Sequence, residues 1–197
     1  YKQGKLDEAA VHYQKALAIN PRQKESHCSL GAILIEQGKL DEAMSHCHEA
    51  VRIDPEFAEA FHNLGRALWL KGQYGEAVTA WREAARLRPK RTAQLRQLAW
   101  ALATCPDKSA RNGAEALGLV QRAMASSGES ADLLDVLAAV QAENGGFAQA
   151  VETAQKAAKL ASERGDAALA DTIRTRIALY QSGSAFRDTE APRGASQ

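Results

Sequence analysis

The fold of this chain is decided by a phrase that occurs as Gly4-Lys5-Leu6-Asp7-Glu8-Ala9, as Gly38-Lys39-Leu40-Asp41-Glu42-Ala43 and as Gly72-Gln73-Tyr74-Gly75-Glu76-Ala77. Each copy begins 34 residues after the one before it. Two other columns keep the same step, namely Ala16, Ala50 and Ala84, and Pro21, Pro55 and Pro89. Self-similarity at this period is typical of stacked helical hairpins. The repeat therefore predicts an all-α fold, an α-solenoid of antiparallel helix hairpins.

The recurring phrase and the columns that keep its step divide the whole chain into repeats. We expect a half repeat at 1–23, hairpins at 24–57, 58–91, 92–128 and 129–163, a capping helix at 166–181 and a flexible tail at 182–197. The hairpin at 92–128 carries a loop insertion at 105–113. Pro106 must end the preceding helix, and the pair Asn112-Gly113 is typical of a turn. The first residue, Tyr1, falls in the middle of a repeat, so we expect the chain to be the C-terminal part of a longer protein.

Three details of this division can be checked individually. Asp7 is expected to cap the first helix, which would run over residues 5–20. Asp166 is expected to cap the last helix, after a stop at Gly165. That last helix presents Leu169, Ile173, Ile177 and Tyr180 on one side, and its opposite, polar side includes Arg176.

Composition limits the function. The chain has 197 residues, of which 45% are apolar and 25% charged, as in soluble globular proteins. A formal net charge of +1 gives no reason to expect a nucleic-acid partner, and no apolar run reaches the roughly 20 residues that would insert into a membrane. Cys28, Cys47 and Cys105 form no disulfide framework, and a reducing compartment such as the cytoplasm fits them best.

The spacing Leu64-Gly65, Gly72, Tyr74, Ala77, Trp81, Ala84, Pro89 resembles the tetratricopeptide repeat (TPR), and Leu30 to Pro55 matches equally well. The resemblance implies a right-handed superhelix of helix pairs whose first helices line a concave groove that binds a protein or peptide segment. The stretch from Leu98 to Gly113 resembles a unit at the C-terminal ends of long bacterial TPR proteins.

A metal site, a nucleophilic cysteine and a phosphate-binding loop are not expected. His27, Cys28, His46, Cys47 and His48 are metal-ligand types, but adjacent helical residues point about 100° apart and cannot share one ion. Cys105 has no histidine after His62 to act as its base, and no phosphate-binding loop is present. The sequence thus predicts no metal, no cofactor and no catalytic residue, and we expect that the chain is not an enzyme.

The predicted groove is the best candidate site. Residues at i, i+4 and i+7 of a first helix share one face. On this face the candidate ligand-binding residues are His62, Asn63, Arg66, Trp69, Arg96 and Trp100. Arginine offers forked donors to a carboxylate and tryptophan offers stacking area, so the ligand class includes acidic and aromatic-acidic peptides. The opposing interpretation is that the arginines are only solvated and that the tryptophans pack between hairpins.

Two further functions stay open. The chain could be the non-catalytic C-terminal TPR region of a larger bacterial enzyme, such as a membrane glycosyltransferase, because bacterial chains with similar ends resemble such enzymes. It could also self-associate weakly, because the half repeat leaves Tyr13 and Leu17 short of partners. The lysine–asparagine clamp for chaperone tails is not predicted, since Cys28 and Ala32 stand at its first positions.

Overall fold

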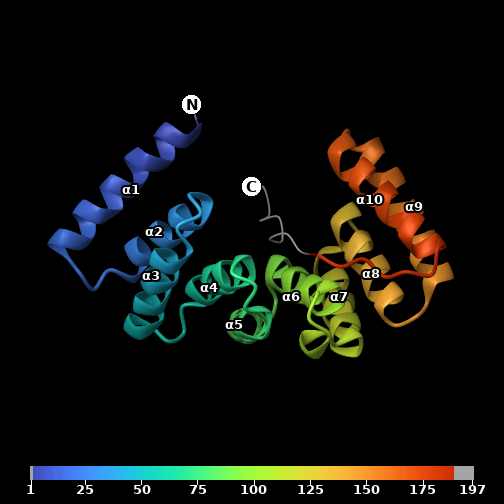
Figure 1. Cartoon of the computed structure of the whole chain (residues 1–197), viewed down its shortest axis with the longest axis horizontal. Coiled ribbons are helices and arrows are strands. Elements are labelled where there is room, and N and C mark those ends of the chain that lie inside the picture. The colour runs from blue at the N-terminus through green and yellow to red at the C-terminus, as the bar shows by residue number, and fades with distance from the viewer. Residues whose placement is uncertain (1, 189–197) are drawn as a thin grey trace. The chain divides into compact units, whose positions relative to one another are not determined.

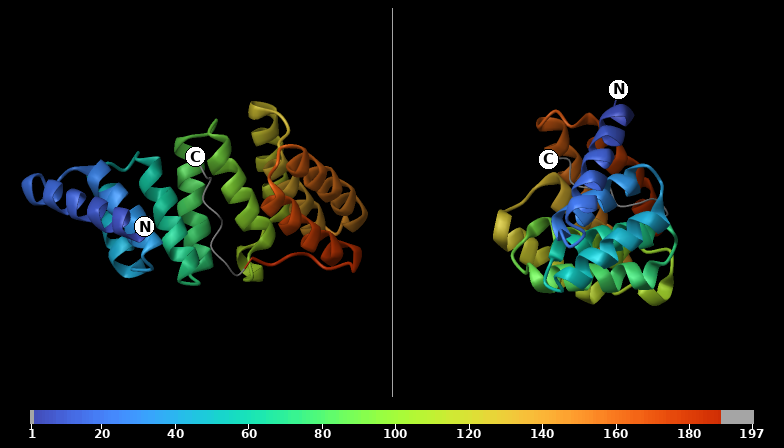
Figure 2. Two further views of the ribbon diagram at one scale, coloured as in Figure 1. Left: turned by 90° about the horizontal axis from the view of Figure 1, so that it is seen from above. Right: turned by 90° about the vertical axis from the view of Figure 1, so that its left-hand side faces the viewer.

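The computed structural model describes residues 2–188, and helices account for most of them. Figures 1 and 2 show the helices in chain order from the blue N-terminus to the red C-terminus. Their bounds are α1 (Lys2–Ile19), α2 (Lys24–Glu36), α3 (Leu40–Ile53), α4 (Ala58–Leu70), α5 (Tyr74–Leu87), α6 (Thr92–Thr104), the 3-10 helix η1 (Lys108–Ala110), α7 (Gly113–Ser127), α8 (Ala131–Glu143), α9 (Phe147–Glu163) and α10 (Ala167–Gln181). Residues 2–188 contain no strand, so the all-α prediction is confirmed.

The described chain divides after Arg88 into two compact units. Unit 1 holds α1 and the hairpins α2–α3 and α4–α5, and unit 2 holds the hairpins α6–α7 and α8–α9 followed by α10. The sequence predicted one uninterrupted solenoid to residue 181, and the division falls near the predicted border between the repeats 58–91 and 92–128. Each unit is a stack of helix pairs, in which neighbouring helices pack on one another.

The recurring glycines end the first helix of each hairpin in unit 1. Gly38 has φ 74° and Gly72 has φ 76°, a left-handed conformation that glycine adopts without a side-chain clash. The next amide in each case donates back into the helix, from Lys39 N to Leu34 O and from Gln73 N to Leu68 O, both at 2.9 Å. This bond satisfies a carbonyl that the helix end would otherwise leave without a donor.

Small residues let the two helices of each hairpin approach closely. In α3 the side chains of Ala43, Cys47 and Ala50 are fully buried. A Cβ atom added at Gly31 of α2 would lie 2.9 Å from Cys47 Sγ. A Cβ atom at Gly65 of α4 would lie 2.5 Å from Trp81 Nε1. The 34-residue columns of small residues therefore mark helix crossings, where larger side chains do not fit.

Asp7 does not cap α1. The helix begins at Lys2, which places Asp7 inside it, because no preceding turn forces a start at Leu6. Asp7 Oδ1 instead accepts a 2.7 Å hydrogen bond from Gln37 Nε2, and Asp41, at the same place in the next repeat, pairs with Lys71 Nζ. Both links join residues 30 apart in sequence. In both repeats, the aspartate of the recurring phrase thus links its helix to the C-terminal end of the helix that follows, α2 for Asp7 and α4 for Asp41.

Tyr13 and Leu17 are not short of partners, because both pack against the apolar cluster of α2 and are partly buried. The exposed large apolar side chains of α1 are Val11, at 46% exposed, and Ile19, at 87%. These two residues face away from the α2 contact. Any self-association through the half repeat would rest on them.

Unit 2 follows the predicted boundaries around the insertion and the cap. α6 ends at Thr104, before Pro106, and the side chain of Asn112 caps α7 by accepting from Glu115 N at 3.0 Å. Asp166 caps α10 by accepting from Leu169 N at 3.0 Å, as expected. Ile173 and Tyr180 of α10 are buried against α8 and α9. Within residues 2–188, no helix combines the length and apolar character required to cross a membrane.

Candidate functional site

In unit 1 the predicted site residues lie on α4, and two of them contact the preceding first helix. Asn63 Nδ2 donates to Cys28 O at 3.3 Å. Arg66 forms an ion pair with Glu36 at the end of α2, with 2.6 Å between Arg66 Nη2 and Glu36 Oε1. The guanidinium side chain is 17% exposed and the carboxylate side chain 51%. Arg66 is therefore a mostly covered cation whose counterion is about half exposed to solvent.

Of the other two predicted residues of α4, Trp69 belongs to the core of the α4–α5 hairpin, and His62 is partly buried at its border. Trp69 is 2% exposed, and its ring packs edge-on against Tyr74 at 4.8 Å and against Trp81 at 5.4 Å between centroids. His62 contributes its backbone carbonyl, which accepts from Trp81 Nε1 at 3.1 Å. The opposing interpretation expected the tryptophans to pack between hairpins, whereas the Trp69 ring is buried within its own hairpin, against α5.

In unit 2 the predicted residues Arg96 and Trp100 lie on α6. Arg96 pairs with Asp132 at the start of α8, with 3.3 Å between Nη1 and Oδ1, and these side chains are 23% and 54% exposed. The pair has exposures similar to those of Arg66 and Glu36, but it joins α6 to the first helix that follows it, whereas Arg66 reaches the first helix that precedes α4. Trp100 is 9% exposed because other parts of the unit cover its ring.

The chain's own C-terminal segment is one of the elements that cover Trp100. The ring of Phe186 lies 5.8 Å from the Trp100 ring, and Trp100 Nε1 donates to Asp188 Oδ2 at 2.5 Å. The sequence predicted a flexible tail from residue 182, whereas the structure places Ala185–Asp188 in contact with α6 and α8, since Phe186 and Arg187 find specific partners there. The remaining residues of the predicted tail, 189–197, lie outside the described residues.

Arg176 completes this cluster, although the sequence placed it on the polar back of α10. Its guanidinium lies 4.5 Å above the Trp100 ring and 4.7 Å from the Phe186 ring, and Nη1 donates to Asp135 Oδ2. Both charged side chains are nearly buried, at 12% and 8% exposed. The helical pattern of α10 alone could not locate this residue, because its partners come from α6, α8 and the C-terminal segment. In the sequence, the acidic Asp135 on an otherwise apolar face of α8 was the sign that a buried cation lies nearby.

Burial shapes the protonation of this cluster. Loss of solvent raises the pKa of Asp135, and the adjacent Arg176 opposes that shift. Burial, and then the negative charge of Asp135, raise the pKa of Tyr180. Asp135 Oδ1 and Arg176 Nε have no hydrogen-bond partner among residues 2–188. The pair is therefore held by a single direct contact in a poorly solvated position.

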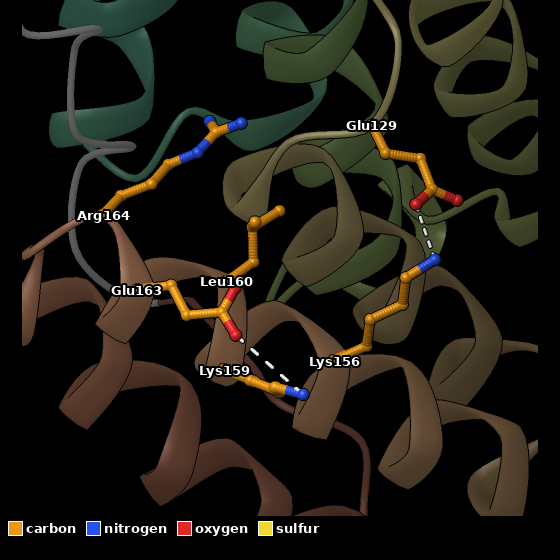
Figure 3. Close-up of a pocket in the computed structure, with 6 residues that line it drawn as sticks. All are labelled: Glu129, Lys156, Lys159, Leu160, Glu163 and Arg164. Carbon is orange, nitrogen blue, oxygen red and sulfur yellow. Dashed lines mark hydrogen bonds and ion pairs between the residues drawn. The ribbon is translucent and has the colours of Figure 1, made fainter.

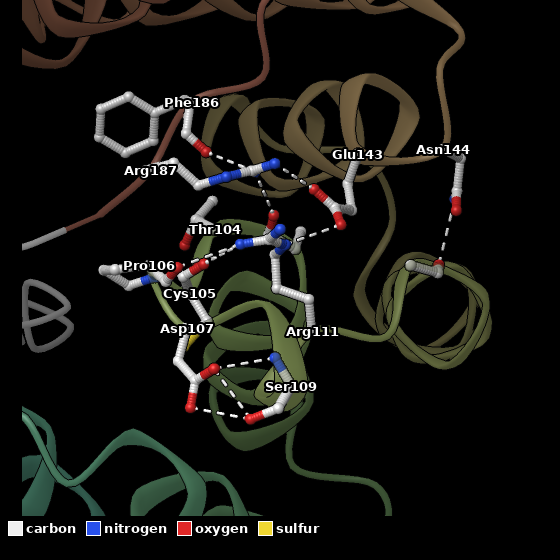
Figure 4. Close-up of polar contacts among 12 residues, drawn as sticks. Thr104, Cys105, Pro106, Asp107, Ser109, Arg111, Glu143, Asn144, Phe186 and Arg187 are labelled. Carbon is white, nitrogen blue, oxygen red and sulfur yellow. Dashed lines mark hydrogen bonds and ion pairs between the residues drawn. The ribbon is translucent and has the colours of Figure 1, made fainter.

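The insertion loop supports the same region from its other side, as Figure 4 shows. Arg111 donates to Cys105 O at 2.9 Å and Pro106 O at 3.2 Å, and it pairs with Glu143 at 2.9 Å. Arg187 reaches the other oxygen of Glu143 at 2.7 Å. Asp107 folds back on its own loop by accepting from Ser109 N at 2.9 Å.

The histidines considered as metal ligands form a hydrogen-bonded pair. His27 Nε2 lies 3.0 Å from Pro21 O, which can only accept, so Nε2 carries a proton. In the neutral pair, His27 Nδ1 then accepts from His46 Nδ1 at 2.9 Å. No group of three or more metal-ligand side chains occurs among the described residues.

This pair predicts a pH dependence of stability in unit 1. Burial, and then His27, lower the pKa of His46 below 6.5, so the unfolded chain binds the proton more tightly than the folded chain. Stability is therefore complete above about pH 6.5 and declines as the pH falls through the lower folded pKa. His46→Gln keeps a donor for His27 but does not titrate. We expect its melting temperature to vary less between pH 7.5 and 5 than that of the parent, and parallel curves would contradict the assignment.

The three cysteines are buried thiols. Burial raises the pKa of Cys28 to about 11 and that of Cys47 to about 12, and it also raises the pKa of Cys105. Each thiol therefore stays protonated at neutral pH and lacks the thiolate that a nucleophile needs.

An open pocket of about 360 Å³ lies along α9 of unit 2. Figure 3 shows its lining, in which Lys156 pairs with Glu129 at 2.5 Å and Lys159 with Glu163 at 3.9 Å. Leu160 and Arg164 complete the wall. Its charged side chains are exposed, and four of the five pair with one another, so the lining indicates no particular ligand.

Stacked helix pairs with small residues at every crossing define the class of helical-hairpin repeat proteins, and the comparisons specify the family. Models of the TPR repeat match residues 1–38 and 31–72, and a further tetratricopeptide repeat model matches residues 58–91. Residues 1–91 therefore carry tetratricopeptide repeats. No curated protein matches it at the level of sequence.

Solved structures similar to this chain are repeat proteins of the same kind. The crystal structure of MamA has a TM-score of 0.69 and 20% identity, over 83% of this chain and 93% of that one. YrrB, a TPR protein with an unusual peptide-binding site, has a TM-score of 0.67 and 22% identity, over 87% and 84%. TTC0263, a thermophilic TPR protein in Thermus thermophilus, has a TM-score of 0.64 and 20% identity, over 92% and 93%. At this identity the likeness establishes the fold.

Proposed function

We propose that the chain is a non-catalytic protein-interaction scaffold, and that the first-helix faces of its units bind peptide or protein segments that carry carboxylates. The observation that carries the proposal is that the ion pairs Arg66–Glu36 and Arg96–Asp132, one in each unit, share the same pattern of exposure. In both, a guanidinium with most of its surface covered is paired with a carboxylate that is about half exposed. An exposed partner contributes little stability, so a ligand carboxylate can replace it at small cost.

The donor geometry supports the same conclusion. Arginine presents a planar fork of five N–H donors that matches a carboxylate. The pair with Glu36 uses one N–H group, from Arg66 Nη2 to Glu36 Oε1, so a ligand carboxylate that replaces Glu36 meets the same terminal donors. Asn63, one turn away, directs its amide N–H groups at Cys28 O and Cys28 Sγ, so it joins α4 to α2 and leaves the carboxylate to Arg66. YrrB, whose fold this chain shares, is described as having a peptide-binding site, which agrees with this use of the fold.

The test is an array of acidic and aromatic-acidic peptides, followed by fluorescence anisotropy on the best ligand. We expect Arg66→Glu combined with Arg96→Glu to abolish binding, because each change turns a donor into a repelling carboxylate. The matched control is Arg52→Glu with Arg86→Glu, which makes the same change of charge on second helices, where these arginines are 64% and 65% exposed. Equal affinity of the double variant and the parent would overturn the groove assignment. If the control variant also lost binding, the effect would come from the change in net charge and not from these two positions.

The alternative, a C-terminal TPR region of a larger bacterial enzyme, stays a prediction, and no contact in the structure favours it. The raised pKa values of the cysteine thiols support a non-catalytic role for the chain itself.

A further inference from the structure

The segment that follows α10 makes contacts of the kind that a bound peptide makes. Asp188 N donates to Thr104 O at 2.8 Å, and Asp188 Oδ2 accepts from Trp100 Nε1 at 2.5 Å. Arg187 forms an ion pair with Glu143 of α8 at 2.7 Å, visible in Figure 4. Three consecutive side chains, Phe186 to Asp188, thus each engage the helices of unit 2.

The aromatic member of the three occupies the most specific position. The guanidinium of Arg176 lies against two neighbouring rings, 4.7 Å from Phe186 and 4.5 Å from Trp100, whose centroids are 5.8 Å apart. A cation this close to an aromatic face is attracted by it, so Arg176 interacts with both rings. The segment therefore offers an aromatic ring to a cation, a cation to a carboxylate and a carboxylate to an indole N–H. Each contact is complementary in charge.

The receiving groups are held in place by residues outside the segment. Asp135 of α8 binds Arg176, and Arg111 of the insertion loop binds Glu143 at 2.9 Å. Both anchors would keep their positions if the segment left. A binding site that is organised in advance loses less entropy when a ligand arrives.

The segment after α10 has the features of a part of the chain that detaches easily from the rest of the unit. Gly183 has φ 72°, which places a left-handed glycine directly after α10. The side chain of Arg187 is 35% exposed and Phe186 is partly buried, whereas Asp188 is 8% exposed. A short segment outside the helices, with two of its three side chains partly exposed, belongs to the less stable parts of a fold, which open locally before the core does.

We propose that Trp100, Thr104, Glu143 and Arg176 form a binding site, the tail site, for an extended partner segment of the pattern aromatic–arginine–aspartate. Phe186–Asp188 is its intramolecular ligand, which a partner segment displaces. The proposal rests on the scaffold function above and names the ligand class of its second unit. Because the intramolecular ligand is tethered, its effective concentration is on the order of millimolar, and a partner must overcome this competition.

The experiment uses the full chain and a labelled peptide with the chain's own sequence Gly-Ser-Ala-Phe-Arg-Asp-Thr-Glu, from residues 183–190. In one variant, Phe186, Arg187 and Asp188 are all replaced by alanine, which removes the tethered competitor and leaves the site intact. We expect this variant to bind the peptide at least about tenfold more tightly than the parent in fluorescence anisotropy. A peptide of the same composition in scrambled order is expected not to bind.

Two further variants keep the test decisive. Trp100→Phe in the alanine background removes the indole donor and is expected to weaken the peptide at least about tenfold. Phe186→Ala alone disturbs the chain least, and we expect it to bind the peptide with an affinity between those of the parent and the triple variant. Circular dichroism reports whether each variant keeps the helical content of the parent.

The outcomes separate this inference from the scaffold function. If folded variants do not bind the peptide, or bind the scrambled one equally, the tail site is wrong, and a continued effect of Arg66 and Arg96 on acidic ligands leaves the scaffold function standing. If the triple variant loses helical content and Phe186→Ala binds no better than the parent, the segment is a structural cap of α6, and the inference is overturned.

Discussion

Arg176→Met is expected to lower the free energy of unfolding by about 3–5 kcal/mol, the loss usual when one partner of a buried ion pair is removed. The methionine keeps apolar volume between Trp100 and Phe186, but it leaves the Asp135 carboxylate, 8% exposed, without its cation. A urea titration at pH 7 measures the loss. Because a typical domain is stable by about 5–15 kcal/mol, the variant could unfold near room temperature.

The pH dependence of this variant has a defined sign. Without Arg176, burial raises the pKa of Asp135 further above 3.8, so the folded chain binds the proton more tightly than the unfolded chain. The stability deficit should therefore shrink as the pH falls toward 3.8 and grow as it rises through the folded pKa. Adding Asp135→Asn removes the charge and should restore much of the stability at pH 7. A deficit that is the same at every pH would contradict the assigned cause.

Gly65→Ala is expected to cost about 3 kcal/mol, although it adds a single methyl group. The new Cβ would lie 2.5 Å from Trp81 Nε1, and Trp81 is 1% exposed and packed against Trp69, so its ring has little room to move. Displacing the ring also breaks its hydrogen bond to His62 O. Overpacking and a lost buried hydrogen bond act together.

Two other glycines calibrate this result. At Gly31 the added Cβ would meet Cys47 Sγ at 2.9 Å, a softer contact, so Gly31→Ala should cost less. At Gly75, in the first turn of α5, nothing lies within 4 Å, and Gly75→Ala should be neutral or stabilising by up to about 1 kcal/mol. The expected order of melting temperatures is Gly75→Ala, Gly31→Ala, Gly65→Ala, from highest to lowest. Any other order would contradict the packing assigned to the small-residue columns.

The hairpins could be predicted because their determinants are local and repeated. Gly38 ends a helix through its own backbone conformation, and Pro106 ends one through its own ring. Small residues at Ala43 and Ala77 recur at a spacing that is visible without a structure. For such positions the physical cause lies within a few residues of the effect, and three copies repeat the information.

The polar contacts could not be predicted in the same way. A helical wheel places Arg176 on the polar side of α10, yet its environment is set by Trp100 and Asp135, which lie far away in sequence. Asp7 was expected to cap a helix because aspartate often does, but its side chain found a partner in Gln37 of the next repeat. Phe186 was the sole aromatic residue in a polar stretch. That single departure was the signal of a docked segment.

The links from Asp7 to Gln37 and from Asp41 to Lys71 also bear on how such a chain can gain or lose length. If residues 24–57 were deleted as a block, Lys71 would take the position of Gln37, and Asp7 would meet an ammonium group in place of an amide. Deleting one residue fewer would rotate the next helix by about 100°, so that Lys71 would no longer face Asp7. Duplication and loss of whole repeats therefore preserve these contacts, so the evolutionary unit of this chain is the 34-residue block, whose ends need no redesign.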